Sequence, residues 1–252
     1  MRCLTFTATV LCLSLMAAPA VFGQETPAKK KAAKKQPGKN QAAFQSLFNG
    51  HDLTGWRGNK DLWSVEDGAI TGRTTADKPI KTNTFLIWQD GEVADFVLRL
   101  DYKIDGGNSG IQYRSRVINE ADYVVGGYQA DIDATLKFAG INYEEKGRGI
   151  LAQRGQRVTI AADGTKSVES IGDAAELGKH IKADDWNSYR LVARGNKLSH
   201  YINNQLMSEV IDQQTDKAAS KGVLAFQVHV GPPMVIQFKN VKLKTVKPAA
   251  SK

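Results

Sequence analysis

The chain has 252 residues, of which 42% are apolar, so it can bury a sizeable core and is not disordered as a whole. Its 34 Lys and Arg against 26 Asp and Glu give a formal charge of +8, which by itself suggests an anionic partner such as nucleic acid or a membrane surface. Both cysteines, Cys3 and Cys12, lie in the first 23 residues. The rest of the chain therefore forms no disulfide, thiol nucleophile or Cys-ligated metal site.

The first 23 residues predict a secretory signal peptide. Arg2 precedes a mostly apolar run from Leu4 to Met16, and small residues follow up to a cleavage point after Ala20 or Gly23. The run is shorter than the ~20 apolar residues of a membrane span, and no later stretch approaches that length. We therefore expect an exported protein, periplasmic or extracellular, without stable membrane insertion.

Residues 24–42 contain six lysines and predict a disordered, Lys-rich linker. Without these lysines and Arg2, 27 basic residues remain, and without Glu25, 25 acidic ones, so residues 43–252 carry only +2. A solvated spacer is favoured over a grip on an anionic polymer. We expect no nucleic-acid partner, a single domain over residues 43–247 and a disordered tail over 248–252.

The elements expected in the domain are nearly all strands. Alternating apolar and polar residues predict strands, in chain order, over 95–105, 108–114, 127–133, 189–193, 197–202, 222–230 and 235–243. Turn residues separate them, as at Asp105-Gly106-Gly107 and at Asn203-Asn204, which has the position of a hairpin turn. Only 173–180 and 212–219 have a pattern that allows a turn or two of helix. Many short strands without a break in composition predict one antiparallel β-sandwich, with a barrel as the alternative.

Three of the predicted strands have unusual polar faces. A solvated sheet face is usually made of Lys, Glu and Thr, whereas these faces consist of Asn108, Gln112 and Arg114, of Gln129, Asp131 and Asp133, and of Gln227 and His229. Such side chains present defined donors and acceptors, as recognition of sugar hydroxyls requires. We expect Asn108, Arg114, Gln129, Asp131, Gln227 and His229 to converge on one concave face.

The aromatic residues divide into core and ligand candidates. Each of the four tryptophans begins or ends an apolar strand, so core packing is expected for Trp56, Trp63, Trp88 and Trp186. Tyr143 lies in a polar segment between glycines, and is the tyrosine most suited to face a ligand.

The opening segment Phe44-Gln-Ser-Leu-Phe-Asn-Gly-His-Asp-Leu-Thr-Gly-Trp56 resembles that of the 3-keto-disaccharide hydrolases, a family formerly called domain of unknown function 1080. Later motifs of the family match in order between residues 63 and 229, so the resemblance covers about residues 44–246. One motif departs from it: many relatives have Gly-Tyr-Glu-x-Gln where this chain has Gly127-Tyr-Gln-Ala-Asp131. The resemblance implies a concanavalin A-like jelly roll, in agreement with the strand pattern.

The resemblance also implies a chemistry. A ketone at C3 of a sugar acidifies the C2 proton, so a base can form an enolate and the C1 group can leave with help from an acid, as lyase or, with water, as hydrolase. The candidates here are His229 as base or acid, Asp131 or Glu145 as its partner, and Arg114 with Asn108 as donors. Three residues would orient the sugar: Gln129, Gln227 and Tyr143.

Two other functions stay open, a non-catalytic carbohydrate-binding module of the same fold and a classical glycoside hydrolase. The second is disfavoured because Glu144 and Glu145, as neighbours in a strand, point to opposite faces. We expect no cofactor and no metal. Asp131 and Asp133 could bind a structural Ca²⁺, but the chain has no dense run of oxygen ligands.

Overall fold

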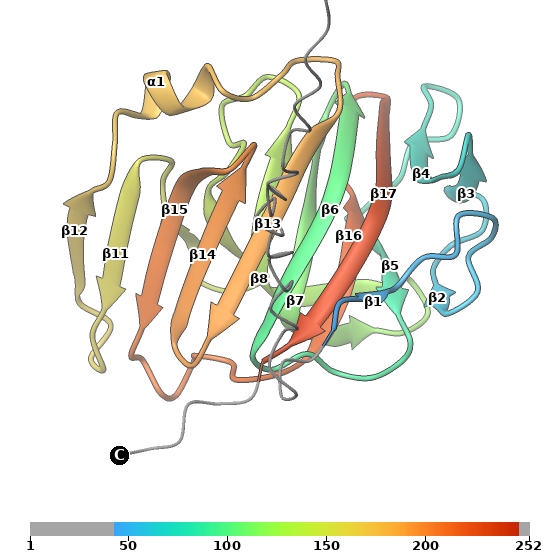
Figure 1. Cartoon of the computed structure of the whole chain (residues 1–252). Helices are drawn as coiled ribbons and strands as arrows, with labels where there is room; N and C mark the ends of the chain where they lie inside the picture. Colours follow the sequence, from blue (N-terminus) through green and yellow to red (C-terminus); the bar gives the residue numbers. More distant parts are fainter. Residues whose placement is uncertain (1–42, 247–252) are drawn as a thin grey trace, which may run out of the picture. The chain divides into compact units, whose positions relative to one another are not determined.

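In the computed structural model, residues 43–246 are described, and they form two β-sheets packed face to face (Figure 1). The predicted signal peptide, linker and C-terminal tail lie outside the described residues. The first sheet has ten strands within this range, in the spatial order β12 (Lys166–Ser170), β11 (Gln156–Ile160), β15 (Gln205–Asp212), β14 (Lys197–Ile202), β13 (Asn187–Arg194), β6 (Phe96–Asp105), β17 (Met234–Thr245), β4 (Ala69–Thr74) and β3 (Trp63–Glu66), with β1 (Gln45–Ser46) paired to β17.

The second sheet has seven strands among the described residues, in the order β10 (Gly149–Ala152), β9 (Asn142–Glu145), β8 (Val124–Asp133), β7 (Asn108–Asn119), β16 (Val223–Val228), β5 (Thr84–Trp88) and β2 (Trp56–Arg57). In both sheets neighbouring strands are antiparallel, except for the parallel pair β11 and β15. The predicted all-β, antiparallel jelly-roll sandwich is confirmed.

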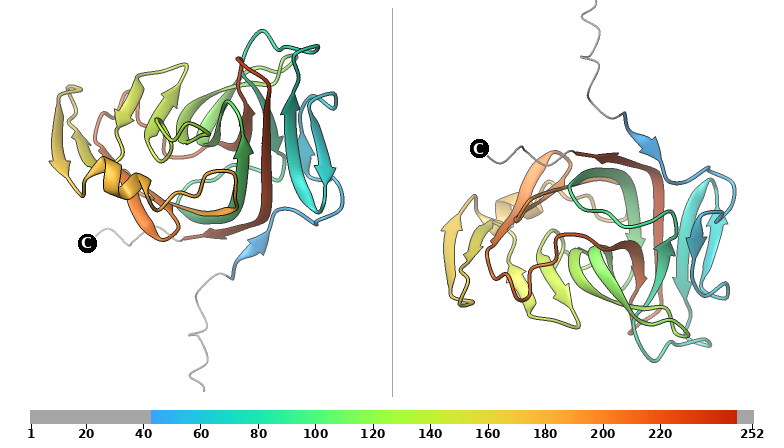
Figure 2. Two further views of the ribbon diagram at one scale, coloured as in Figure 1. Left: turned by 90° about the horizontal axis from the view of Figure 1, so that it is seen from above. Right: turned by 90° about the horizontal axis from the view of Figure 1, so that it is seen from below.

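The main core lies between the sheets, which Figure 2 shows end-on as two layers. Strand β6 illustrates why: Phe96, Leu98 and Leu100 are buried, while the residues between them are more exposed. Trp56, Trp63 and Trp88 are also buried, as expected. Trp186 is an exception, because it precedes β13 and lies half-exposed under the Lys239 ammonium, 3.7 Å from the ring centroid.

The turn and helix predictions have mixed outcomes. Asn203 and Asn204 have φ of 48° and 67° and join β14 to β15, as a tight hairpin requires. Helix α1 (Ala174–Gly178) forms in the first candidate segment, where the Asp173 carboxylate caps the amides of Ala175 and Glu176. The second candidate, 212–219, is not helical: β15 extends to Asp212 and a turn follows.

The outer face of the second sheet is closed at one end and open at the other. The tip of the β7–β8 hairpin folds over this face, where the Tyr123 carbonyl accepts from the Phe85 amide (3.0 Å) and the Asp122 carbonyl from the Thr84 hydroxyl (2.8 Å). A second apolar cluster fills the covered end, and its buried members are Phe85, Ile87, Val125 and Ala225. The uncovered end of the same face holds the pocket described next.

No helix among residues 43–246 is long and apolar enough to cross a bilayer.

Candidate active site

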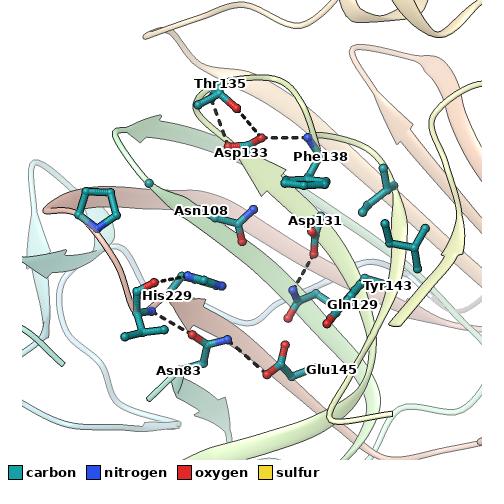
Figure 3. A pocket seen from close by; sticks show the side chains of 15 residues that line it. Asn83, Asn108, Gln129, Asp131, Asp133, Thr135, Phe138, Tyr143, Glu145 and His229 are labelled. Atoms are coloured by element: carbon teal, nitrogen blue, oxygen red, sulfur yellow. Dashed lines mark hydrogen bonds between the residues drawn. The ribbon is translucent and has the colours of Figure 1, made fainter. Parts of the chain in front are cut away.

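A cavity of about 620 Å³ opens on the uncovered end of the second sheet (Figure 3). Its polar lining residues come from β7, β8, β9 and the segments next to β5 and β16, and they are Asn83, Asn108, Gln129, Asp131, Asp133, Thr135, Tyr143, Glu145 and His229. Its apolar walls are Phe138, Ile141, Ile150, Val230 and Pro232. The volume suits one or two sugar rings, and no Lys or Arg is among the described lining residues.

Strand register brings the polar residues together. Asn108 on β7 pairs with Asp133 on β8, and two residues earlier in β8 Asp131 pairs with Gly110. Because side chains of alternate residues share a face, Asp131, Asp133 and Gln129 all point outward from the sheet. On the other side of β8, Tyr143 pairs with Gln129. Five of the predicted residues therefore meet at the pocket with His229, namely Asn108, Gln129, Asp131, Tyr143 and Glu145.

Asp131 is a buried carboxyl group with a strongly shifted pKa. Only 6% of the residue is exposed, and the Gln129 Nε2 donates to its Oδ1 at 2.6 Å. Burial raises the pKa of Asp131 from 3.8 to about 8. Hydrogen bonds from the Gln129 and Asn108 side chains oppose this rise, and the nearby Glu145 and Asp133 carboxyl groups add to it. At neutral pH the side chain is mainly a carboxylic acid, which can donate a proton.

His229 follows the end of β16 and is half-buried at the pocket edge, with Asn108 between it and Asp131 (Figure 3). Its Nδ1 lies 2.5 Å from the Val230 carbonyl oxygen. A carbonyl oxygen only accepts, so Nδ1 carries a proton here, and Nε2 is the ring nitrogen left to exchange a proton with a ligand. Such a nitrogen can act as a general base.

Glu145 and Tyr143 belong to β9 and approach Asp131 from the other side. The Asn83 amide links the two sides of the pocket, because its Nδ2 donates to Glu145 Oε1 at 3.3 Å and its Oδ1 accepts from the Val230 amide at 2.9 Å. Burial, with Glu145 and Asp131 nearby, raises the pKa of Tyr143, so its phenol stays a neutral donor. As the strand pattern predicts, Glu144 points to the opposite face from Glu145; there it bonds to Arg148.

Asp133 stabilises the wall of the pocket. Its Oδ2 accepts from the Thr135 hydroxyl (2.8 Å) and the Phe138 amide (2.9 Å) and so anchors the loop that carries Phe138 (Figure 3). These bonds use lone pairs that a Ca²⁺ shared with Asp131 would need. Within residues 43–246, no group of three or more His, Asp or Glu is placed to hold a metal ion.

Arg114 does not face the pocket, contrary to the prediction. The pairing of β7 with β8 shifts between Tyr113 and Arg116, and Arg114 has φ of 47°, so the alternation that relates it to Asn108 is broken there. Its guanidinium is buried and binds Asp95 Oδ1 (2.8 Å) and the Gly195 carbonyl (2.7 Å). The residue therefore holds neighbouring loops together, and Asn108 and Tyr143 remain as neutral donors in the pocket.

Gln227 is also wrong as a sugar-binding residue. It lies on the expected face, paired with Phe85, but it is fully buried and outside the pocket lining. Neither atom of its amide has a hydrogen-bond partner among the described residues. A sugar hydroxyl cannot reach it without a rearrangement of the floor.

The sequence patterns gave no signal for Asn83, Thr135 and Phe138 of the lining or for Ser115 beneath it, and they placed Gln112 on a polar face without a role in the site. Asn83 precedes a strand and carries no periodic signal, and it becomes part of the site only because β5 lies two strands from β7. Gln112 has the same phase as Asn108, and that phase is its only sequence signal. The contact that connects Gln112 to the site is its hydrogen bond to Gln129 on the neighbouring strand β8.

The sandwich fold and a sugar-sized pocket lined by both a buried acid and a histidine fit a carbohydrate-active domain. The model of the 3-keto-alpha-glucoside-1,2-lyase-like domain matches residues 43–244, and the chain belongs to this family. Comparison with proteins of curated function gives no match.

Solved structures with the same fold share little sequence with the chain. Two proteins from Parabacteroides distasonis, provisionally described as glycosyl hydrolases, have TM-scores of 0.54 and 0.52 and identities of 18% and 22%; 81% of this chain aligns with 100% and 94% of theirs. The carbohydrate-binding module CBM66 from Bacillus subtilis has a TM-score of 0.50 and 15% identity, over 76% of this chain and 96% of its own. At these identities the likeness concerns the fold.

Proposed function

We propose that the pocket cleaves 3-keto-glycosides by removing the C2 proton and expelling the C1 group. The observation that carries the proposal is the buried Asp131, protonated at neutral pH, in one sugar-sized cavity with a histidine whose Nδ1–H donates to a backbone carbonyl. An acid and a base with separate environments are what an elimination of this kind needs. The family described above supports the same substrate class.

The steps follow from these two groups. His229 Nε2 removes the proton from C2, and the electron pair moves onto the C3 oxygen as an enolate, which Asn108 and Tyr143 stabilise as hydrogen-bond donors. When the ketone reforms, the bond from C1 to the leaving oxygen breaks, and that oxygen takes the proton of Asp131. The product has a double bond between C1 and C2. Addition of water to it in the pocket gives net hydrolysis, and release before water adds gives a lyase.

The charge of the pocket restricts the substrate. Asp131, Asp133 and Glu145 line it, and no Lys or Arg among the described lining residues balances them. A carboxylate on the sugar would meet only acidic side chains and neutral dipoles. We therefore propose neutral 3-keto-disaccharides as substrates and expect uronate-containing ones to be rejected. We also propose export of the protein, on the composition of its first 23 residues.

Incubation of the purified protein with a 3-keto-disaccharide and with its unoxidised parent tests the function. Release of the leaving sugar is measured by mass spectrometry or NMR. Cleavage of the keto sugar alone supports the proposal. Cleavage of the parent identifies a classical glycoside hydrolase, and saturable binding without cleavage identifies a carbohydrate-binding module; either result overturns the proposal.

A further inference from the structure

Beneath the pocket, three buried side chains form a continuous chain of hydrogen bonds that ends on Asp131. The Ser115 hydroxyl donates to Gln112 Oε1 at 2.6 Å, Gln112 Nε2 donates to Gln129 Oε1 at 2.7 Å, and Gln129 Nε2 donates to Asp131 Oδ1 at 2.6 Å. Ser115, Gln112 and Gln129 are 4%, 0% and 2% exposed. The chain runs across β7 and β8, and two of its members lie outside the pocket lining.

The chain of hydrogen bonds has one direction. An amide accepts only at its oxygen and donates only at its nitrogen, so the orientation of Gln112 determines that of Gln129. In the observed order each of the three links joins a donor to an acceptor, and an NH₂ group faces Asp131. In the reverse order the Gln129 oxygen would face Asp131, which is repulsive whenever Asp131 is ionised. The observed order suits both protonation states of Asp131.

Two glycines, Gly110 and Gly127, leave room for the side chains of this hydrogen-bond chain. A Cβ at position 110 would lie 2.5 Å from the Gln129 Cδ, so only glycine lets Gln129 lie flat across β7. At the other end Gly127 has φ of 144°, and a Cβ there would lie 2.6 Å from the Ser115 hydroxyl. The backbone is therefore shaped around both ends of the chain, which indicates more than incidental pairing of buried polar groups.

We infer that Ser115, Gln112 and Gln129 are positioning residues, and that their polarised relay fixes Asp131 Oδ1 as an acceptor and leaves Oδ2 as the oxygen that carries the exchangeable proton. The role of that proton in cleavage rests on the proposed function. Gln129 therefore has another role than the one expected from the sequence. Its oxygen bonds to Gln112 and one of its N–H groups to Asp131, so it positions the acid rather than the sugar.

The relay is tested by titration of the Asp131 carboxyl group by ¹³C NMR in the full-length protein, which needs no activity. The variant is Gln112→Met, which keeps the length of the side chain and breaks the relay outside the pocket. Gln227→Met is the matched control, because Gln227 is equally buried on the same sheet and its amide has no partner among the described residues. Both variants leave unchanged the titratable groups near Asp131, namely Asp133, Tyr143, Glu145, Tyr189 and His229.

Without its partner the Gln129 amide donates less well to Oδ1, so Gln112→Met is expected to raise the pKa of Asp131 by about half a unit or more. Gln227→Met is expected to leave it unchanged, and Ser115→Ala to give a smaller rise than Gln112→Met. If Gln112→Met fails to fold, Ser115→Ala decides by the same comparison with Gln227→Met. No shift, or an equal shift in the control, overturns the relay; absence of cleavage with the shift present overturns the proposed function alone.

Discussion

Two buried aspartates have opposite electrostatic surroundings, Asp131 on β8 of the second sheet and Asp212 on β15 of the first. Asp131 faces the pocket and is 6% exposed, while Asp212 faces the interior between the sheets and is 2% exposed. Asp131 has amide neighbours and two more carboxyl groups. Asp212 Oδ2 accepts from Arg148 Nη2 at 2.6 Å and from the Tyr128 hydroxyl at 2.5 Å.

Burial pushes both carboxyl groups toward the neutral form, and the partners decide the outcome. At Asp212 the hydrogen bonds from Arg148 and Tyr128 outweigh burial, so its pKa is lowered, whereas at Asp131 the pKa rises to about 8. Arg148 also binds Glu144, so one guanidinium serves two interior acids. A buried acid beside a cation stabilises the fold, and one without a cation keeps a proton available for chemistry.

The largest expected difference between the two is in catalysis. Asp131→Asn removes the proton donor, and we expect the turnover of a 3-keto-disaccharide to fall by about 10²- to 10⁴-fold, the usual contribution of a general acid. The same substitution at Asp212 is the control, and its folded fraction is expected to keep its kcat. A turnover above one tenth of the original in Asp131→Asn would remove Asp131 from the mechanism.

Removal of the cation from the interior pair comes next in size. Arg148→Leu leaves Asp212 and Glu144 buried without a counter-charge, so we expect a loss of about 3–5 kcal/mol in the free energy of unfolding, measured with denaturant. Arg73→Leu is the matched control, because its pair with Glu66 is exposed on both sides and is worth at most about 1 kcal/mol. Equal losses in both variants would show that the buried ion pairs of Arg148 contribute no more to the free energy of unfolding than an exposed pair.

The fold could be predicted because its signals are local. Alternation in β6 and β13 depends only on which residues meet the core, and the Asn203-Asn204 turn depends on two residues that tolerate positive φ. The errors have local causes too. A shift in strand pairing between Tyr113 and Arg116 reversed the expected face of Arg114. The segment 212–219 is polar up to Ala218 and forms a turn in place of the expected helix.

The site could be predicted only in part, since its chemistry depends on neighbours across the sheet. The alternation in β7 and β8 puts Asp131, Asn108 and Gln129 on one face, and the pocket contains all three. Gln227 has the same phase, yet it is fully buried and lies outside the pocket lining. No alternation in the sequence reveals that a hairpin will fold over half of a sheet, or that Gln112 will meet Gln129.

The smallest expected effect is a difference in how stability depends on pH. The folded-state pKa of Asp131, about 8, is above its unfolded value of 3.8, so between pH 4 and 8 the unfolded state releases a proton that the folded state keeps. Stability therefore falls as pH rises through this window, by at most about 1.4 kcal/mol per pH unit.

The pKa of Asp212 is lowered on folding, so its contribution is present above its unfolded pKa and is lost as pH falls through the folded value. Relative to the original protein, Asp131→Asn should gain stability steadily from pH 4 to 8, whereas the deficit of Asp212→Asn should stay constant above about pH 5 and shrink below it. Denaturant unfolding at each pH measures both differences, and a flat difference for Asp131→Asn between pH 4 and 8 would mean that Asp131 is ionised in the fold and cannot be the acid.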